Sequence, residues 1–171
     1  ATGSVRIDDL EVVLVSYRSR HHVEELLAGW PEALHVVIVD NSADIDGVSE
    51  LAHSHANVRL LSGGGQGFAR AANLGAYTSE KPFVVFVNPD CRPTIDQMVS
   101  LAEGLARDDG AICHAATPIS PEGVIEIGAG GWEPSIPRAL VHASGVHKVL
   151  PRRGLYAHPQ VGEHIDVDWV T

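Results

Sequence analysis

Four short apolar runs, separated by segments of helical periodicity, constrain the fold of this 171-residue chain more than any other feature. The runs are rich in valine, leucine and isoleucine, as strands buried on both faces are, and lie at residues 10–15, 35–39, 58–61 and 83–87. Apolar residues recur at helical spacing at residues 22–30, 45–52, 68–79 and 95–105. This alternation predicts an α/β fold, in which a mostly parallel sheet is sandwiched by helices.

The pattern weakens after the last of these helices. A fifth strand is predicted at 111–115, a hairpin between 117–119 and 124–127, and an alternating strand at 166–171. Glycine, proline, histidine and arginine recur between residues 128 and 164, which favours a mobile surface loop over residues 128–161. Since no repeat and no second domain is visible, we expect one domain over residues 1–171.

Composition excludes several classes of protein. The formal net charge of −10 and the lack of a basic block argue against a nucleic-acid partner. No apolar run is long enough to span a bilayer. Cys91 and Cys113 form no CxxC motif and no disulfide framework, so they fit a reducing compartment. The ten histidines are scattered, and His53 and His55 do not share a helical face, so we expect no zinc site.

The fourth apolar run ends at an Asn-Pro-Asp sequence. Pro89 removes a backbone donor and stops the strand, which places Asp90 directly past its end and Asn88 before it. Ligands of open α/β sheets bind at this carboxyl edge, and a carboxylate suits a hard divalent cation. We therefore predict that Asp90 binds Mg²⁺ or Mn²⁺, which in turn holds phosphates. A turn aspartate is the alternative.

Two further loops are predicted to reach the same edge. One contains Ser16, Tyr17 and Arg18, and the other contains Asp40 and Asn41. An aromatic ring can stack on a base, a carboxylate can bond base or ribose, and a cation can neutralise phosphate. A helix N-cap for Asp40 and an edge aromatic for Tyr17 are the alternatives. Together the three loops favour a nucleoside diphosphate site.

The glycine-rich segment at 62–67 matches neither common phosphate-binding motif. No Gly-Lys-Ser/Thr follows it, as a P-loop requires, and the third glycine of the dinucleotide fingerprint is absent. It is therefore interpreted as a flexible loop or one that approaches a neighbour closely.

Five motifs in a fixed order carry a family resemblance. They are Val-Val-Leu-Val-Ser-Tyr at 12–17, Val-Val-Ile-Val-Asp-Asn-Ser at 36–42, Gly-Phe-Ala-Arg-Ala-Ala-Asn-Leu-Gly at 67–75, Phe-Val-Asn-Pro-Asp at 86–90 and Val-Asp-Trp-Val at 167–170. The chain resembles the nucleotide-binding part of family 2 inverting glycosyltransferases, which have the GT-A (Rossmann-like) fold. It is most similar to their rhamnosyltransferase-like branch, which acts in bacterial cell-envelope assembly.

The resemblance implies a donor, an acceptor and a location. The donor would be a dTDP- or UDP-sugar, and the acceptor a saccharide or lipid-linked molecule that is glycosylated with inversion. The intact protein would be cytoplasmic, in peripheral contact with the inner face of the membrane. Residues 1–171 would be the donor-binding domain without its C-terminal acceptor-binding part.

Roles for individual residues also follow from the resemblance. Residues lining the base or bonding the pyrimidine ring would be Ser16, Tyr17, Arg18, Asp40 and Asn41. Those shaping the ribose and sugar side would be Gly67, Phe68 and Asn73, and the Asp-x-Asp metal motif would be replaced by Asn88-Pro89-Asp90. The chain departs from the family at Asn88, which leaves one carboxylate for the metal, and at Ala72, where many relatives carry arginine.

The catalytic base of this family follows the Trp-Val segment, which implies a base beyond Thr171 and leaves Asp168 as the weaker candidate. We therefore expect this chain to bind donor without transferring sugar. Two other functions stay open. One is a non-catalytic nucleotide-binding module that retains the donor pocket. The other is a nucleotidyltransferase. Such an enzyme would be expected to carry a glycine-rich phosphate loop with arginine and lysine after the first strand, and residues 16–19 lack that loop.

Overall fold

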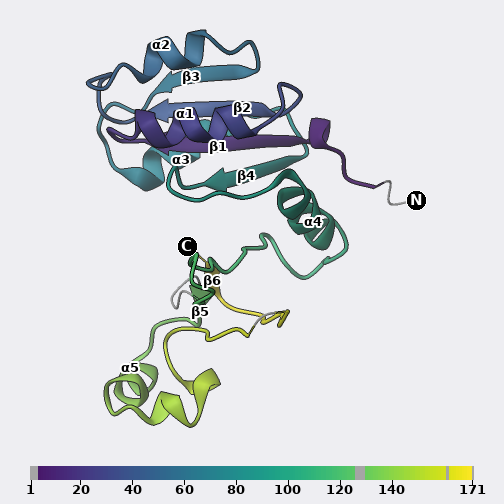
Figure 1. Ribbon diagram of the computed structural model, residues 1–171. Helices are drawn as coiled ribbons and strands as arrows, with labels where there is room; N and C mark the ends of the chain where they lie inside the picture. Colours follow the sequence, from purple (N-terminus) through teal and green to yellow (C-terminus); the bar gives the residue numbers. More distant parts are fainter. Residues whose placement is uncertain (1–3, 126–129, 161, 171) are drawn as a thin grey trace. The chain divides into compact units, whose positions relative to one another are not determined.

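The computed structural model describes residues 4–125, 130–160 and 162–170. The chain divides into two compact units, Ala1–Arg107 and Asp108–Thr171 (Figure 1). The expectation that residues 1–171 form one donor-binding domain stays a prediction.

Unit 1 is built on a parallel sheet of four strands in the order β3-β2-β1-β4. The strands are β1 (Leu10–Ser16), β2 (His35–Asp40), β3 (Val58–Ser62) and β4 (Phe83–Val87). Each predicted strand is confirmed to within one residue at either end. The first strand of the sequence lies inside the sheet, because it pairs with both β2 and β4.

Helices cover both faces of this sheet (Figure 1). A 3-10 turn, η1 (Ile7–Asp9), precedes β1, and the helices are α1 (Arg20–Gly29), α2 (Val48–His53), α3 (Phe68–Tyr77) and α4 (Ile95–Ala106). Successive strand side chains point to opposite faces. Val12, Leu14 and Ile38 therefore pack with α1, α2 and α4, whereas Val13 and Val39 pack with α3. The predicted α/β fold is confirmed.

Small residues let α3 lie close to the sheet. Ala71, Ala72 and Gly75 form its buried face. A Cβ atom at Gly75 would lie 2.5 Å from Val13 Cγ1, so no side chain fits there without movement. The small buried face of α3 thus allows a close approach of helix and strand.

The first turns of α4 and α1 are capped differently. Thr94 Oγ1 accepts from the Gln97 backbone N–H at 3.2 Å, and Gln97 Oε1 accepts from the Thr94 N–H at 2.9 Å, which forms a capping box at the start of α4. Ser19 occupies the N-cap position of α1. Its hydroxyl, however, lies 3.0 Å from Ser16 Oγ and caps no helical N–H.

Two predictions in unit 1 were wrong in detail. We expected β4 to be buried on both faces, but it is an edge strand within the described sheet, and Phe86 is 53% exposed. We expected helix from residue 45, but α2 begins at Val48 and Ile45 is 66% exposed. Gly47, the N-cap of α2, has a φ angle of 70°, a left-handed conformation that prevents a right-handed helix from running through residues 45–48.

Unit 2 is mostly irregular. It contains β5 (Gly130–Gly131) paired antiparallel with β6 (Trp169–Val170), the helix α5 (Ile136–Ala143), and the 3-10 turns η2 (Val146–Lys148) and η3 (Pro151–Arg153). No described helix in either unit is long and apolar enough to cross a bilayer.

Several predictions for unit 2 were wrong. The segment 111–115 forms no strand, and Ile112 is 98% exposed. The predicted hairpin is reduced to one antiparallel bridge between Ile119 and Ile125, with residues 126–127 outside the described part. The strand expected at 166–171 covers only Trp169–Val170 among its described residues.

The region expected to be a loop, 128–161, contains a helix. Residues 128, 129 and 161 lie outside the described part. Ser135 Oγ accepts from the Arg138 N–H at 3.4 Å, and Pro137 lies in the first turn, which together start α5. No residue of α5 is buried, although its apolar residues Ile136, Leu140 and Ala143 recur at helical spacing.

Candidate functional site

The sheet of unit 1 contains a point at which strand order reverses. From β1 the chain adds β2 and β3 on one side and then β4 on the other. In open parallel sheets, ligands bind beyond the carboxyl ends of the strands at such a point. Ser16, Asp40 and Ser62 lie opposite one another in register, and Val87 lies opposite Leu14. The predicted loops after β1, β2 and β4 therefore leave the sheet at one edge.

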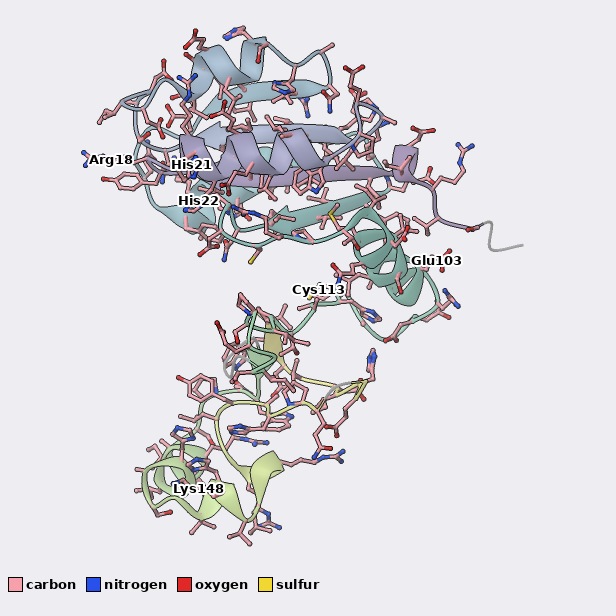
Figure 2. All side chains as sticks on the ribbon, in the orientation of Figure 1. Arg18, His21, His22, Glu103, Cys113 and Lys148 are labelled. Atoms are coloured by element: carbon pink, nitrogen blue, oxygen red, sulfur yellow. The ribbon has the colours of Figure 1, made fainter. Side chains whose placement is uncertain are left out.

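The loop after β1 presents an aromatic ring and a cation. Ser16 is fully buried, whereas Tyr17 is 62% exposed. Arg18 Cζ lies 5.6 Å from the centre of the Tyr17 ring, within the range of a cation–π contact. Figure 2 shows Arg18 pointing outward past the strand ends. The exposed ring is thus available for stacking, with the guanidinium beside it.

Backbone strain is concentrated at this edge. Among the described residues, the non-glycine residues with positive φ are Arg18, Ala43 and Asp44. All three lie in the loops that follow β1 and β2. Each such conformation costs about 1–3 kcal/mol, and strained residues of this kind cluster at ligand sites. The strain thus coincides with the edge identified from strand order.

Asp40 is occupied by its own turn. It is 6% exposed, and its carboxylate accepts hydrogen bonds from the Ser42 N–H and hydroxyl, both at 2.8 Å, and from the Asp44 N–H. These bonds close a turn within the loop, and Asp40 caps no helix, because the N-cap of α2 is Gly47. A carboxylate offers about four lone-pair sites, so one remains for a ligand. Pyrimidine binding by Asp40 stays a prediction.

Asn41 has an unsatisfied acceptor. Its side chain is 7% exposed, and its backbone N–H donates to the Ser16 carbonyl at 2.8 Å. Its Oδ1 atom is buried and accepts no hydrogen bond from the described residues. A Cβ atom at Gly63 would lie 2.9 Å from this oxygen, so glycine there leaves it room. A buried polar atom without a partner costs about 1–3 kcal/mol, and a ligand N–H or O–H would remove that cost.

The Asn88–Asp90 turn is held from outside the motif. The Cys91 N–H donates to the Asn88 carbonyl at 2.9 Å, and Arg92 Nη1 donates to the Pro89 carbonyl at 2.8 Å. Asn88 and Asp90 are exposed, and no described residue hydrogen-bonds the Asp90 carboxylate. A hard divalent cation fits such a free carboxylate. The metal assignment itself stays a prediction.

Arg92 is a residue that the sequence interpretation missed. Besides holding the turn, it forms an ion pair with Glu25 of α1, and its Nη2 lies 3.3 Å from His22 Nδ1. The hydrogen bond from Arg92, followed by the charge of His21, holds the pKa of Glu25 below its ordinary value. Figure 2 shows His21 and His22 on the same side of the molecule as Arg18. The sequence already placed Arg92 near the predicted site, because it lies two residues after Asp90.

The other predicted residues are not joined to this cluster. Gly67 is the N-cap of α3 with φ 89°, and Phe68 is 57% exposed. Asn73 is exposed, and no described hydrogen bond links it to the loops after β1, β2 and β4. The weaker candidate for the base, Asp168, lies in unit 2, where its Oδ2 accepts from the Glu133 N–H at 2.7 Å.

The sequence matches glycosyl transferase family 2 over residues 11–139. The match covers most of the chain, and the chain belongs to this family. Its parallel sheet with helices on both faces is the GT-A-like α/β fold of the family.

Several solved structures are similar to part of the chain. S. aureus TarS 1–349 has 23% sequence identity and a TM-score of 0.44, and the match covers 57% of this chain and 31% of that one. The same TarS fragment in complex with UDP has 23% identity and a TM-score of 0.42, over 56% and 32% of the two chains. The chain thus spans less than one third of either structure's length. A search among curated proteins found no match.

Proposed function

We propose that this chain binds the nucleoside diphospho-sugar donor of a family 2 glycosyltransferase. The observation that carries the proposal is the reversal of strand order between β1 and β4, with the loops after β1, β2 and β4 leaving one sheet edge. Family membership supports the reaction class. The protein containing this chain would transfer a sugar to an acceptor hydroxyl with inversion.

The donor base is proposed to be a pyrimidine, as in UDP- or dTDP-sugars. Tyr17 supports stacking, since its ring is exposed beside Arg18. Asn41 Oδ1 supports a hydrogen-bond donor on the ligand, since it is buried without a partner. Asp40 orders its own loop through hydrogen bonds from Ser42. Its carboxylate can still accept a hydrogen bond from the ring N–H of the base. Gly67, Phe68 and Asn73 are proposed to shape the sugar side.

The diphosphate is proposed to bind through Mg²⁺ or Mn²⁺ held by Asp90, with Asn88 beside it. An exposed carboxylate with no described partner supports this role. The bound cation would neutralise charge on the leaving diphosphate as a Lewis acid. Arg92 positions the turn through the Pro89 carbonyl, so it would act on the metal only through Asp90.

The acceptor side of the proposal rests on the family resemblance. The acceptor would be a cell-envelope saccharide or lipid-linked molecule, in the rhamnosyltransferase-like branch, at the inner face of the membrane. A carboxylate outside residues 1–171 would deprotonate the acceptor hydroxyl. Asp168 is the weaker choice, since its carboxylate is bonded to the Glu133 backbone.

Calorimetry with UDP, dTDP and GDP, each with and without Mn²⁺, tests the donor site. We expect UDP or dTDP to bind more tightly than GDP, and Mn²⁺ to strengthen binding to the parent chain. Asp90→Ala should lose the Mn²⁺ enhancement and keep the metal-independent affinity. Asp8→Ala is a matched control, because Asp8 is an exposed aspartate in the turn that precedes β1.

Two outcomes contradict the proposal. If GDP binds most tightly, the pyrimidine assignment is wrong, and if Asp90→Ala responds to Mn²⁺ as the parent does, the metal assignment is wrong. A non-catalytic nucleotide-binding module would show the same binding. Sugar transfer by the protein that contains this chain separates the two functions, because only the glycosyltransferase turns over.

A further inference from the structure

A cluster of two histidines and one aspartate lies in unit 2. Ligand atoms of Asp108, His114 and His164 all lie within 4.8 Å of one another. This cluster could not be predicted from the sequence, because His114 and His164 lie fifty positions apart and no metal-binding spacing links them. None of the three residues belongs to the proposed donor site, which lies in unit 1.

The spacing of the first two residues already suits a shared ion. His114 Nε2 and Asp108 Oδ2 are 3.1 Å apart, and the His114 side chain is 11% exposed. Two ligand atoms bound about 2.0–2.1 Å from a tetrahedral zinc ion lie roughly 3.3 Å from each other. Little movement of Asp108 and His114 would therefore be needed to place both around one cation.

The third residue is free to adjust. The ring of His164 lies 5.2 Å from that of His114 in an edge-to-face arrangement, and His164 is exposed. No hydrogen bond to another described residue holds its imidazole in place. His164 also lines a small hollow together with Trp132, Arg152 and Asp166.

We propose that Asp108, His114 and His164 form a binding site for a zinc-type divalent cation. Two imidazoles and one carboxylate are donors that zinc prefers, whereas Mg²⁺ prefers oxygen ligands alone. The three protein ligands leave a fourth tetrahedral position for water. The site thus differs in metal preference from the proposed oxygen-ligand site at Asp90.

The bound ion would link distant parts of unit 2. Asp108 and His114 lie just after α4, and His164 lies five residues before Trp169 of β6. Joining them closes a long, mostly irregular stretch of chain. An ion that binds only the folded form raises stability in proportion to the logarithm of its concentration above Kd. The expected consequence is a zinc-dependent rise in the melting temperature.

Zinc calorimetry and thermal unfolding of the parent and four variants test the site. We expect one Zn²⁺ to bind the parent and raise its melting temperature, with no comparable effect of Mg²⁺. His164→Ala should weaken zinc binding more than about tenfold, since even loss of an outer partner of a metal site costs about 10–100-fold. Because His164 makes no described hydrogen bond, this variant should fold as the parent does. Asp108→Asn, which keeps the size of the side chain, should also weaken binding.

The remaining variants separate this site from adventitious binding. His21→Gln removes an imidazole from an exposed pair with Glu25 on α1, 3.1 Å apart, and should bind zinc as the parent does. Cys113→Ser removes the exposed thiol next to His114, labelled in Figure 2, and should also leave binding unchanged. Failure of zinc to bind the parent, or equal binding by His164→Ala, would overturn the proposal. Nucleotide binding in the presence of Mn²⁺ should be the same in His164→Ala and the parent, so this test is independent of the proposed donor site.

Discussion

Asp40 and Asn41 are adjacent and equally buried, yet their polar atoms are satisfied differently. The Asp40 carboxylate bonds two residues of its own loop, whereas Asn41 Oδ1 bonds no described residue. Substituting Asp40 would therefore change the shape of the loop as well as any contact with a base. Asn41 is the cleaner probe of the ligand, because its side-chain oxygen has no structural partner to lose.

Gly75 is the residue at which added volume should matter most. Gly75→Ala would place Cβ 2.5 Å from Val13 Cγ1. We expect a loss of about 1–3 kcal/mol in the free energy of unfolding, as for other overpacked cores. Urea denaturation measures it, with Gly29→Ala as control, because a Cβ atom there would meet nothing within 4 Å. Alanine is the better helix former by about 1 kcal/mol, so the control should be neutral or stabilised. Equal stability of Gly75→Ala and the parent would contradict the close packing of α3.

At the scale of secondary-structure elements, one ion pair joins β1, β3 and the end of α3. Glu11 is 6% exposed at its side chain, and Arg59 Nη2 lies 3.0 Å from Glu11 Oε1 and 3.0 Å from the Thr78 carbonyl. Glu11 Oε2 is buried and accepts no hydrogen bond from the described residues. Arg59 is therefore the main group that neutralises the buried carboxylate of Glu11.

Removing Arg59 alone should lower the free energy of unfolding more than removing both Arg59 and Glu11. We expect Arg59→Met to lose about 2–3 kcal/mol, below the range for a fully buried pair because Arg59 is half exposed. The double variant Glu11→Leu with Arg59→Met should recover most of that loss, since it leaves no unpaired charge. Urea denaturation of the two variants and the parent measures this. A double variant less stable than Arg59→Met would show that the pair itself stabilises the sheet.

The sequence predicted the inner elements well and the outer ones poorly. Strands β1 and β2 are nearly continuous apolar runs, and helices cover both their faces. A continuous apolar run indicates burial on both faces, so these strands could be predicted from the sequence. The run at Phe83–Val87 looks the same but forms an edge, because sheet order depends on pairing between distant residues. The segment 111–115 has strand composition but no described strand partner, so its composition was misleading. Helix α5 has apolar residues at helical spacing, but the frequent glycine, proline and histidine residues around it favoured a loop.

The candidate site was predictable in position and not in its contacts. The ends of parallel strands share one edge, so Tyr17, Asp40 and Asp90 could be grouped from the sequence alone. The hydrogen bonds within the Asp40 loop depend on left-handed backbone at Ala43 and Asp44, which those residue types do not specify. Arg92 supports its turn from a position outside the motif and was missed for that reason.

At the scale of the whole molecule, unit 2 contains a stack of histidines that should make it sensitive to acid. The His142 and His147 rings lie 4.3 Å apart, and those of His147 and His158 lie 6.0 Å apart. Each of the three has a buried ring nitrogen without a described partner. Tyr156 packs edge-on against His142. Burial first, and the charges of His147 and His142 next, lower the pKa of His158 from its ordinary value of 6.5.

This shift fixes the sign of the pH dependence. Below the ordinary pKa of 6.5, the unfolded chain takes up a proton at His158 that the folded chain resists. Stability is therefore lost as the pH falls from about 7.5 to about 5.5. The pKa of Asp108 lies below 3.8, so that carboxylate titrates in a lower range.

Thermal unfolding with a chelator present tests the acid sensitivity without a metal contribution. His158→Gln cannot take up the proton, so its melting temperature should fall less between these two pH values than that of the parent. His35→Gln, an exposed position at the start of β2, is the control and should keep the parent slope. A His158→Gln slope equal to that of the parent would contradict the assignment to this stack.

The central position of β1 has a consequence for the order in which the protein can fold during synthesis. Leu10–Ser16 leaves the ribosome before both of the strands with which it pairs, β2 on one side and β4 on the other. Its second side cannot be covered until Phe83–Val87 has been made. Until then the nascent chain exposes an unpaired strand edge, which can pair with another chain. A pause in translation before residue 87 would prolong that exposure. The timing of synthesis therefore bears directly on whether β1 pairs with β4 of its own chain or with a strand of another chain.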